Sequence, residues 1–127
     1  MAKDENGMQV VFKPGANLTN AKLTYFLGPR AKLANADLTN ADLNHADLSS
    51  ADLRWANLTG ADLRWADLSK AKLNNANLTG ADLRWADLRW AGADLTNANL
   101  TGADLRWADL TNANLTNAKM PKGTIHI

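Results

Sequence analysis

The stretch ANLTGADLRWADL occurs three times in this chain, at residues 56–68, 76–88 and 98–110. Identical segments of this length within 127 residues indicate a tandem repeat, in which the period rather than local propensity decides the fold. Inside the stretch a shorter unit recurs: Ala, then Asp or Asn, then Leu, then two further residues. Outward from the stretch, the same five-residue unit runs almost unbroken from Ala16 to Met120.

A five-residue period fits neither a helix nor a continuous strand. In a helix, the Leu column would rotate by about 140° at each repeat and wander round every face. In a strand, side chains alternate with period two, so an odd period would move Leu from face to face. The pattern is satisfied if the chain turns once per five residues. Ala and Leu, two positions apart, then point inward together, and the next two residues, rich in Thr, Asn, Gly and Ser, form a corner.

A longer period lies above the five-residue unit. The segment ANLTGADLRW returns after 20 residues, from 56 to 76, and then after 22, from 76 to 98. Four units per coil predict coils that stack as parallel strands about 4.8 Å apart, each hydrogen-bonded to its neighbours. We therefore predict an all-β solenoid of about five coils with an Ala and Leu core. Inward positions include Leu58, Leu63, Leu78, Leu83, Ala56, Ala61, Ala76 and Ala81.

The repeated A-(D/N)-L-x-x unit resembles the pentapeptide-repeat family over roughly residues 16–120. This resemblance implies a right-handed quadrilateral parallel β-helix with four five-residue faces per coil. The segment from Met120 to His126 is also similar to a common C-terminal ending in that family. The resemblance is specific for fold and much weaker for function, because one fold can host many functions.

The ends of the array are expected to need caps, because an exposed solenoid end presents unpaired backbone and bare Leu side chains. We assign residues 1–15, with the extended stretch Gln9–Phe12, to an N-terminal cap. Residues 16–120 form the solenoid, and residues 121–127 form a C-terminal cap.

Two internal segments depart from the motif. In Phe26–Arg30, Phe takes the place of the small Ala and Gly28 takes the place of the inward Leu, so the exchange is expected to conserve core volume. Ala91-Gly92 adds two residues before the register resumes. We expect a bulge at a corner to absorb this insertion, since Gly tolerates unusual backbone angles.

At four units per coil, ring-bearing residues form one outward column at the last position of the second face. We interpret it as a stacking ladder, worth about 0.5–1.5 kcal/mol per pair beyond area burial. The alternative is a binding stripe for a sugar, a nucleobase or a partner protein. This aromatic and basic edge comprises Tyr25, His45, Trp65, Trp85 and Trp107, with Arg64, Arg84 and Arg106 one position earlier.

Composition and motifs exclude several classes of function. The chain has no cysteine and a formal net charge of +1, so neither thiolate chemistry nor nucleic-acid binding is expected. An apolar run of membrane-spanning length and a signal peptide are absent, which predicts a cytoplasmic protein with no membrane partner. Outward acids are interleaved with Lys, Arg and Asn, so we interpret them as a solvated, salt-bridged face. With no P-loop, HExxH or Ser/His/Asp pattern, we expect no enzyme, cofactor or metal.

Three functions are compatible with this sequence. Repeat identity and agreement between sequence levels favour a designed or consensus structural scaffold with no catalytic activity and no native ligand. The family resemblance implies a second function, a DNA-mimicking inhibitor of a topoisomerase such as gyrase. Inhibitors of that kind carry a strongly negative surface, whereas the acids here are balanced by Arg and Lys. The third is a carbohydrate- or protein-binding module on the Trp/Arg edge. No partner is required, and self-association through that edge or a solenoid end is left open.

Overall fold

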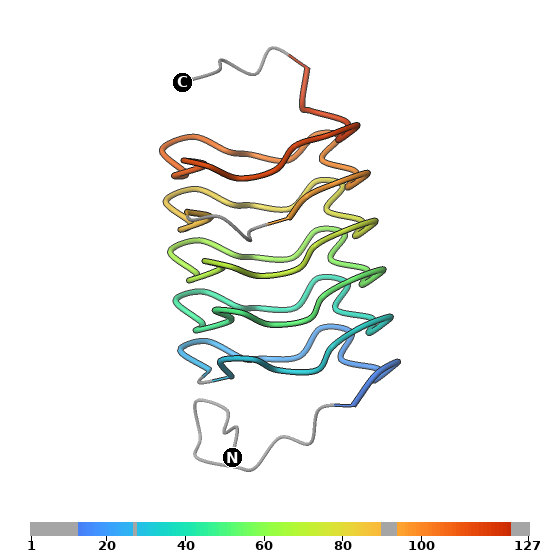
Figure 1. The fold of residues 1–127 in the computed structure, drawn as a ribbon. Helices are drawn as coiled ribbons and strands as arrows, with labels where there is room; N and C mark the ends of the chain where they lie inside the picture. The colour runs from blue at the N-terminus through green and yellow to red at the C-terminus, as the bar shows by residue number, and fades with distance from the viewer. Residues whose placement is uncertain (1–12, 27, 90–93, 123–127) are drawn as a thin grey trace.

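The computed structural model describes residues 13–26, 28–89 and 94–122. In these ranges the chain winds into a stack of coils that rises regularly from the early residues to the late ones (Figure 1). The described residues contain no helix. Consecutive coils pair through single-residue parallel bridges at the second position of the five-residue units. The predicted all-β solenoid with four short faces per coil is therefore confirmed.

The register of the coils follows the long period of the sequence. In one column, Asp52 pairs with Lys72 twenty residues later, Lys72 pairs with Asp94 twenty-two residues later, and Asp94 pairs with Asn114. The stack thus accommodates two additional residues and resumes its spacing of twenty. The inserted Ala91-Gly92, and the bulge predicted there, lie outside the described residues.

Each corner is a four-residue turn from the Leu of one unit to the Ala of the next. The N–H of Ala61, for example, donates to the C=O of Leu58 at 3.0 Å. The residue before the Ala has a positive φ, as in Gly60 with φ of 68°. A positive φ at the third residue of a turn with this hydrogen bond is the pattern of a type II turn, which favours Gly or Asn. The corners therefore explain the Asn and Gly at the fifth position of many units.

The core consists of inward Leu and Ala residues, which form a Leu column and an Ala column on each face and run along the solenoid. The predicted inward residues are at most 1% exposed, and all buried side chains of the described residues are apolar. Because the Ala side chains are small, the four faces can approach closely around the Leu side chains. The narrow interior is then filled at the packing density that is usual in protein cores. The inward residues that we predicted lie in this core: Leu58, Leu63, Leu78, Leu83, Ala56, Ala61, Ala76 and Ala81.

The predicted exchange of a large and a small residue in the unit Phe26–Arg30 is also confirmed. Phe26 is fully buried at the position of an Ala, and a Cβ atom built on Gly28 would lie 2.0 Å from Cε2 of its ring. The ring therefore occupies the space that the inward Leu fills in other units.

The ends of the described stack are less covered than its middle. Leu18 at one end and Leu105, Leu110 and Leu115 at the other are only partly buried. Coil pairing extends one residue into the assigned N-terminal cap, because the N–H of Gly15 donates to the C=O of Ala34 at 2.8 Å. Of the two assigned caps, residues 1–12, which include Gln9–Phe12, and residues 123–127 lie outside the described residues.

Candidate functional site

The ring-bearing residues of the second face form a continuous stack, which we call the ring ladder. Neighbouring centroids lie 4.7, 5.9, 4.9 and 4.9 Å apart, and the interplanar angles are 18°, 11°, 3° and 10°. This separation matches the spacing of adjacent strands, so the coil repeat itself brings the rings into contact. In chain order the ladder comprises Tyr25, His45, Trp65, Trp85 and Trp107.

The tryptophans of the ladder remain open to solvent although they stack. Trp65 is 51% exposed and Trp85 43%, compared with 61% for Trp107 at the last described rung. Trp55, on another face, is 63% exposed. Trp90, which the sequence also places on another face, lies outside the described residues. The ladder is therefore the largest set of exposed rings that the described part of the chain brings together.

The rings occupy a backbone position that does not suit them. Trp65, Trp85 and Trp107 have φ of 61°, 65° and 61°, in the left-handed region where a bulky residue is an outlier. For non-glycine residues this region costs roughly 1–2 kcal/mol. Stacking between coils offsets part of this cost in the ladder. Trp55, which lies outside the ladder, has a φ of 62° and therefore the same unfavourable backbone conformation.

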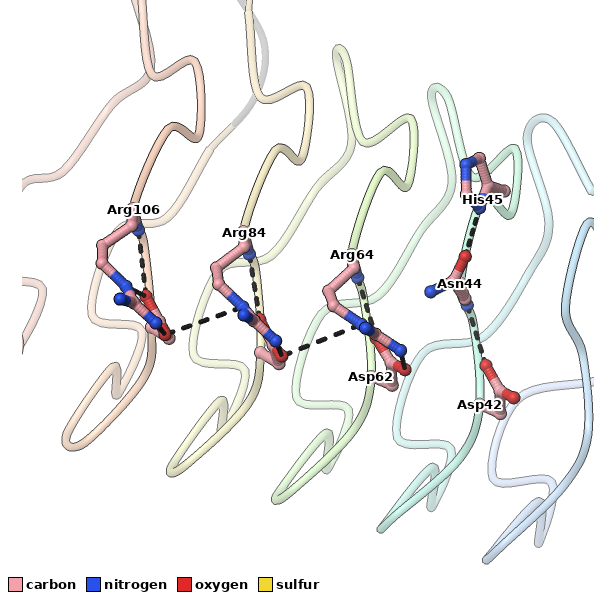
Figure 2. Close-up of polar contacts among 9 residues, drawn as sticks. Asp42, Asn44, His45, Asp62, Arg64, Arg84 and Arg106 are labelled. Atoms are coloured by element: carbon pink, nitrogen blue, oxygen red, sulfur yellow. Dashed lines mark hydrogen bonds and ion pairs between the residues drawn. The ribbon is translucent and has the colours of Figure 1, made fainter.

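Acids and arginines alternate in a column along consecutive coils (Figure 2), which we call the Arg–Asp column, and each of its arginines directly precedes a tryptophan of the ladder in the sequence. Within each unit the pair is bidentate: Nε of Arg64 donates to Oδ1 of Asp62 at 2.9 Å and Nη2 to Oδ2 at 2.7 Å. Between units, Nε of Arg64 lies 3.8 Å from Oδ2 of Asp82. The column comprises Asp62, Arg64, Asp82, Arg84, Asp104 and Arg106.

The arginines hold the pKa of the carboxyl groups below the usual range. Hydrogen bonds from Arg84 lower the pKa of Asp82, and hydrogen bonds from Arg106 lower the pKa of Asp104, against an opposing effect of partial burial. At Asp62, burial raises the pKa, but the hydrogen bonds from Arg64 outweigh it and the net shift is downward. All three carboxyl groups therefore stay ionised at neutral pH. A general acid would need a raised pKa, which the Arg–Asp column does not provide.

The Asp or Asn at the second position of a unit also has a local structural role that the sequence analysis missed. Oδ1 of Asp82 accepts a hydrogen bond from the backbone N–H of Arg84 at 3.2 Å. Oδ1 of Asn77 accepts one from the N–H of Thr79 at 3.0 Å and another from its hydroxyl. Asp and Asn side chains bond in this way to the backbone two residues later in Asx turns. The sequence signal that could have predicted these Asx turns is the constant spacing of two residues between the Asp or Asn and the first corner residue.

The Arg–Asp column ends at the coil of His45. There Asn44 takes the place of the arginine and its N–H donates to Oδ1 of Asp42 at 3.1 Å (Figure 2). The side-chain oxygen of Asn44 contacts Nδ1 of His45. Asn44 thus keeps the backbone bond to the acid but supplies no cation to pair with it, and its side chain contacts the imidazole that stacks on Trp65.

In the part of the chain that is described, no group of three or more His, Cys, Asp or Glu side chains could hold a metal ion. The same residues include no helix long and apolar enough to cross a membrane. The candidate site is therefore the outer surface formed by the ring ladder and the Arg–Asp column.

Comparison with known proteins identifies the architecture. The sequence matches the family described as pentapeptide repeats, in eight copies, over residues 30–64, 56–91 and 91–122. A pentapeptide repeat protein, Rfr23, from the cyanobacterium Cyanothece 51142 is 31% identical, with a TM-score of 0.75 and 90% of each chain covered. The pentapeptide repeat protein alr5209 from Nostoc PCC 7120 is 34% identical, with a TM-score of 0.52, and the match covers 74% of this chain and 77% of that one. A search of curated proteins gave no match.

Proposed function

This chain belongs to the pentapeptide-repeat family, whose members form right-handed quadrilateral β-helices, and we propose that it is a structural scaffold without catalytic activity. The observation that carries the proposal is the uniform apolar core, in which the same two residue types recur in every coil. The three identical copies of ANLTGADLRWADL further support a designed or consensus origin. A sequence specifies one fold when its period, its turn residues and its core residues all favour the same structure, as they do here.

The polar side chains support the same proposal, because they accept hydrogen bonds that stabilise the corners. Oδ1 of Asp37 accepts from the N–H and the hydroxyl of Thr39, and Asp67 does the same for Ser69. In the described part of the chain the acids are spread along the faces, and no three of them gather in one cluster that could hold a metal ion. We propose that the chain folds without a ligand or partner and that it resides in the cytoplasm.

Thermal unfolding followed by circular dichroism tests the scaffold role. A core repeated through every coil should give one cooperative transition at high temperature. A broad transition at low temperature, of the kind given by a chain that needs a partner to fold, would contradict the proposal.

Inhibition of gyrase by DNA mimicry is the second function to test. A mimic presents a long negative surface, but here Lys and Arg number 14 and Asp and Glu 13. The arginines also lie directly on the acids, as Arg84 does on Asp82. A supercoiling assay with the protein titrated in, alongside a gel shift with DNA, should show no effect. Inhibition at low micromolar protein without DNA binding would establish the mimic and overturn the scaffold proposal.

Binding of a carbohydrate or protein on the Trp/Arg edge is the third function, and the exposure of the ring ladder supports testing it. Stacking covers the faces of Trp65 and Trp85, however, and a sugar stacks on a ring face. Titration with oligosaccharides should therefore leave the tryptophan fluorescence unchanged. A saturable shift would favour the binding module, and light scattering would show whether two chains associate through the same edge.

A further inference from the structure

The interior tryptophans of the ring ladder present ring edges rather than ring faces to solvent. Trp65 has His45 and Trp85 stacked on its two sides, and Trp85 has Trp65 and Trp107. Both side chains are nevertheless about half exposed, at 51% and 43%. Because the neighbouring rings cover the faces, the exposed area of these two residues lies along the edges. The solenoid therefore displays a row of aromatic edges parallel to its axis.

A row of edges has a definite chemical preference. An aromatic ring carries a negative face and a positive edge, so an edge attracts the face of another ring. A flat conjugated ligand laid lengthwise on the ladder would meet each rung in this edge-to-face arrangement. Five rungs at the observed centroid distances span about 20 Å, close to four strand spacings. We propose that the ring ladder binds an elongated, planar aromatic ligand along the solenoid axis.

Other occupants fit this surface less well. A nucleobase needs an aromatic face on which to stack, and the interior rungs offer none. A second copy of the chain would bring positive edges against positive edges. The adjacent charges are already satisfied, since Arg64 pairs with Asp62 at 2.7 Å and Arg84 with Asp82 at 2.6 Å. Recognition should therefore depend on the rings and change little with salt.

The uncharged dye 1,6-diphenyl-1,3,5-hexatriene, a rod-shaped aromatic molecule whose emission rises when it leaves water, is a suitable probe. The full chain titrated with the dye should give a saturable rise at one dye per chain. Trp65→Asn and Trp85→Asn each remove an interior rung, and Asn suits the left-handed corner, so the fold should be kept. Each variant should bind about two- to tenfold more weakly, the change that one edge-to-face pair provides.

Trp55→Asn is the matched control. Trp55 has the same residue type, a corner φ of 62° and a larger exposed fraction, but it lies on another face. This variant should bind the dye as the parent does, and circular dichroism should show that all three variants remain folded. No saturable rise, equal losses in Trp55→Asn and Trp85→Asn, or loss of binding at high salt would each overturn the proposal. None of these results bears on the scaffold role, which rests on cooperative unfolding.

Discussion

The indole rings of Trp65 and Trp85 lie 3° from parallel with their centroids 4.9 Å apart, although twenty residues separate them in the chain. The coil repeat produces this contact, because it places corresponding corners one strand spacing apart. The same corners hold both residues at positive φ, at 61° and 65°. Each tryptophan of the ladder therefore combines favourable stacking between coils with an unfavourable backbone conformation. The difference between these two free energies can be measured.

Replacement of ladder and non-ladder tryptophans by Gly should separate these two effects. Trp55→Gly and Trp85→Gly both relieve the left-handed strain, and both add freedom to the unfolded chain. Only Trp85→Gly also loses two stacked pairs, each worth about 0.5–1.5 kcal/mol. In urea unfolding, Trp85→Gly should therefore be less stable than Trp55→Gly by about 1–3 kcal/mol. Equal stability of the two variants would show that the stacking contributes nothing.

Truncation of a core leucine should be costly. Leu63 is fully buried in the middle of the stack, so Leu63→Ala should leave a cavity and lower the free energy of unfolding by about 2–5 kcal/mol. Chemical denaturation of the variant measures this loss. A change below about 1 kcal/mol would mean that the neighbouring coils collapse into the space, a response that close packing normally limits.

Enlargement of the small column should also destabilise the solenoid. Ala61 is fully buried beside the Leu column, and Ala61→Leu would force additional methylene groups into a filled cross-section. Overpacking of this kind typically costs about 1–3 kcal/mol. The melting temperature should fall, and an unchanged value would be inconsistent with the inward position of the Ala column.

The exchange between Phe26 and Gly28 predicts a compensating pair of substitutions. Phe26→Ala alone should cost about 3–5 kcal/mol by emptying the space of the ring. Gly28→Leu alone should clash with that ring, since even a Cβ would lie 2.0 Å from Cε2. The double variant restores the common Ala and Leu arrangement and should be more stable than either single variant. A double-mutant cycle measures the coupling, and additive losses would refute the exchange.

Acid should weaken the solenoid through the Arg–Asp column. Because hydrogen bonds from Arg84 lower the pKa of Asp82, the unfolded chain binds its proton at a higher pH than the folded chain. The resulting stability is complete above the unfolded pKa of about 3.9 and is lost as the pH falls through the lower, folded pKa. The contribution of Asp82 to the midpoint of urea unfolding should therefore be constant from pH 7 to about 5 and fall below about pH 4.

Asp82→Asn isolates the ionic part of this effect. The amide can still accept the corner hydrogen bond, as Asn77 does from the N–H of Thr79 at 3.0 Å. The variant should therefore fold, and its urea midpoint should depend less on pH than that of the parent. Identical pH dependence in the two proteins would show that Asp82 does not contribute to it.

The sequence alone determined the architecture, because a period of five residues fits neither a helix nor a continuous strand. The Ala and Leu columns can be buried only if the chain turns at every unit. It also placed Trp65 and Trp85 in one column, since a register of twenty follows from the repeat. The tertiary structure decided how these groups are used. Which ring surface is open, and which carboxylate Arg64 contacts in the next coil, depend on side-chain torsions and on packing between distant residues. A one-dimensional period defines the backbone register of a solenoid but leaves those torsions free.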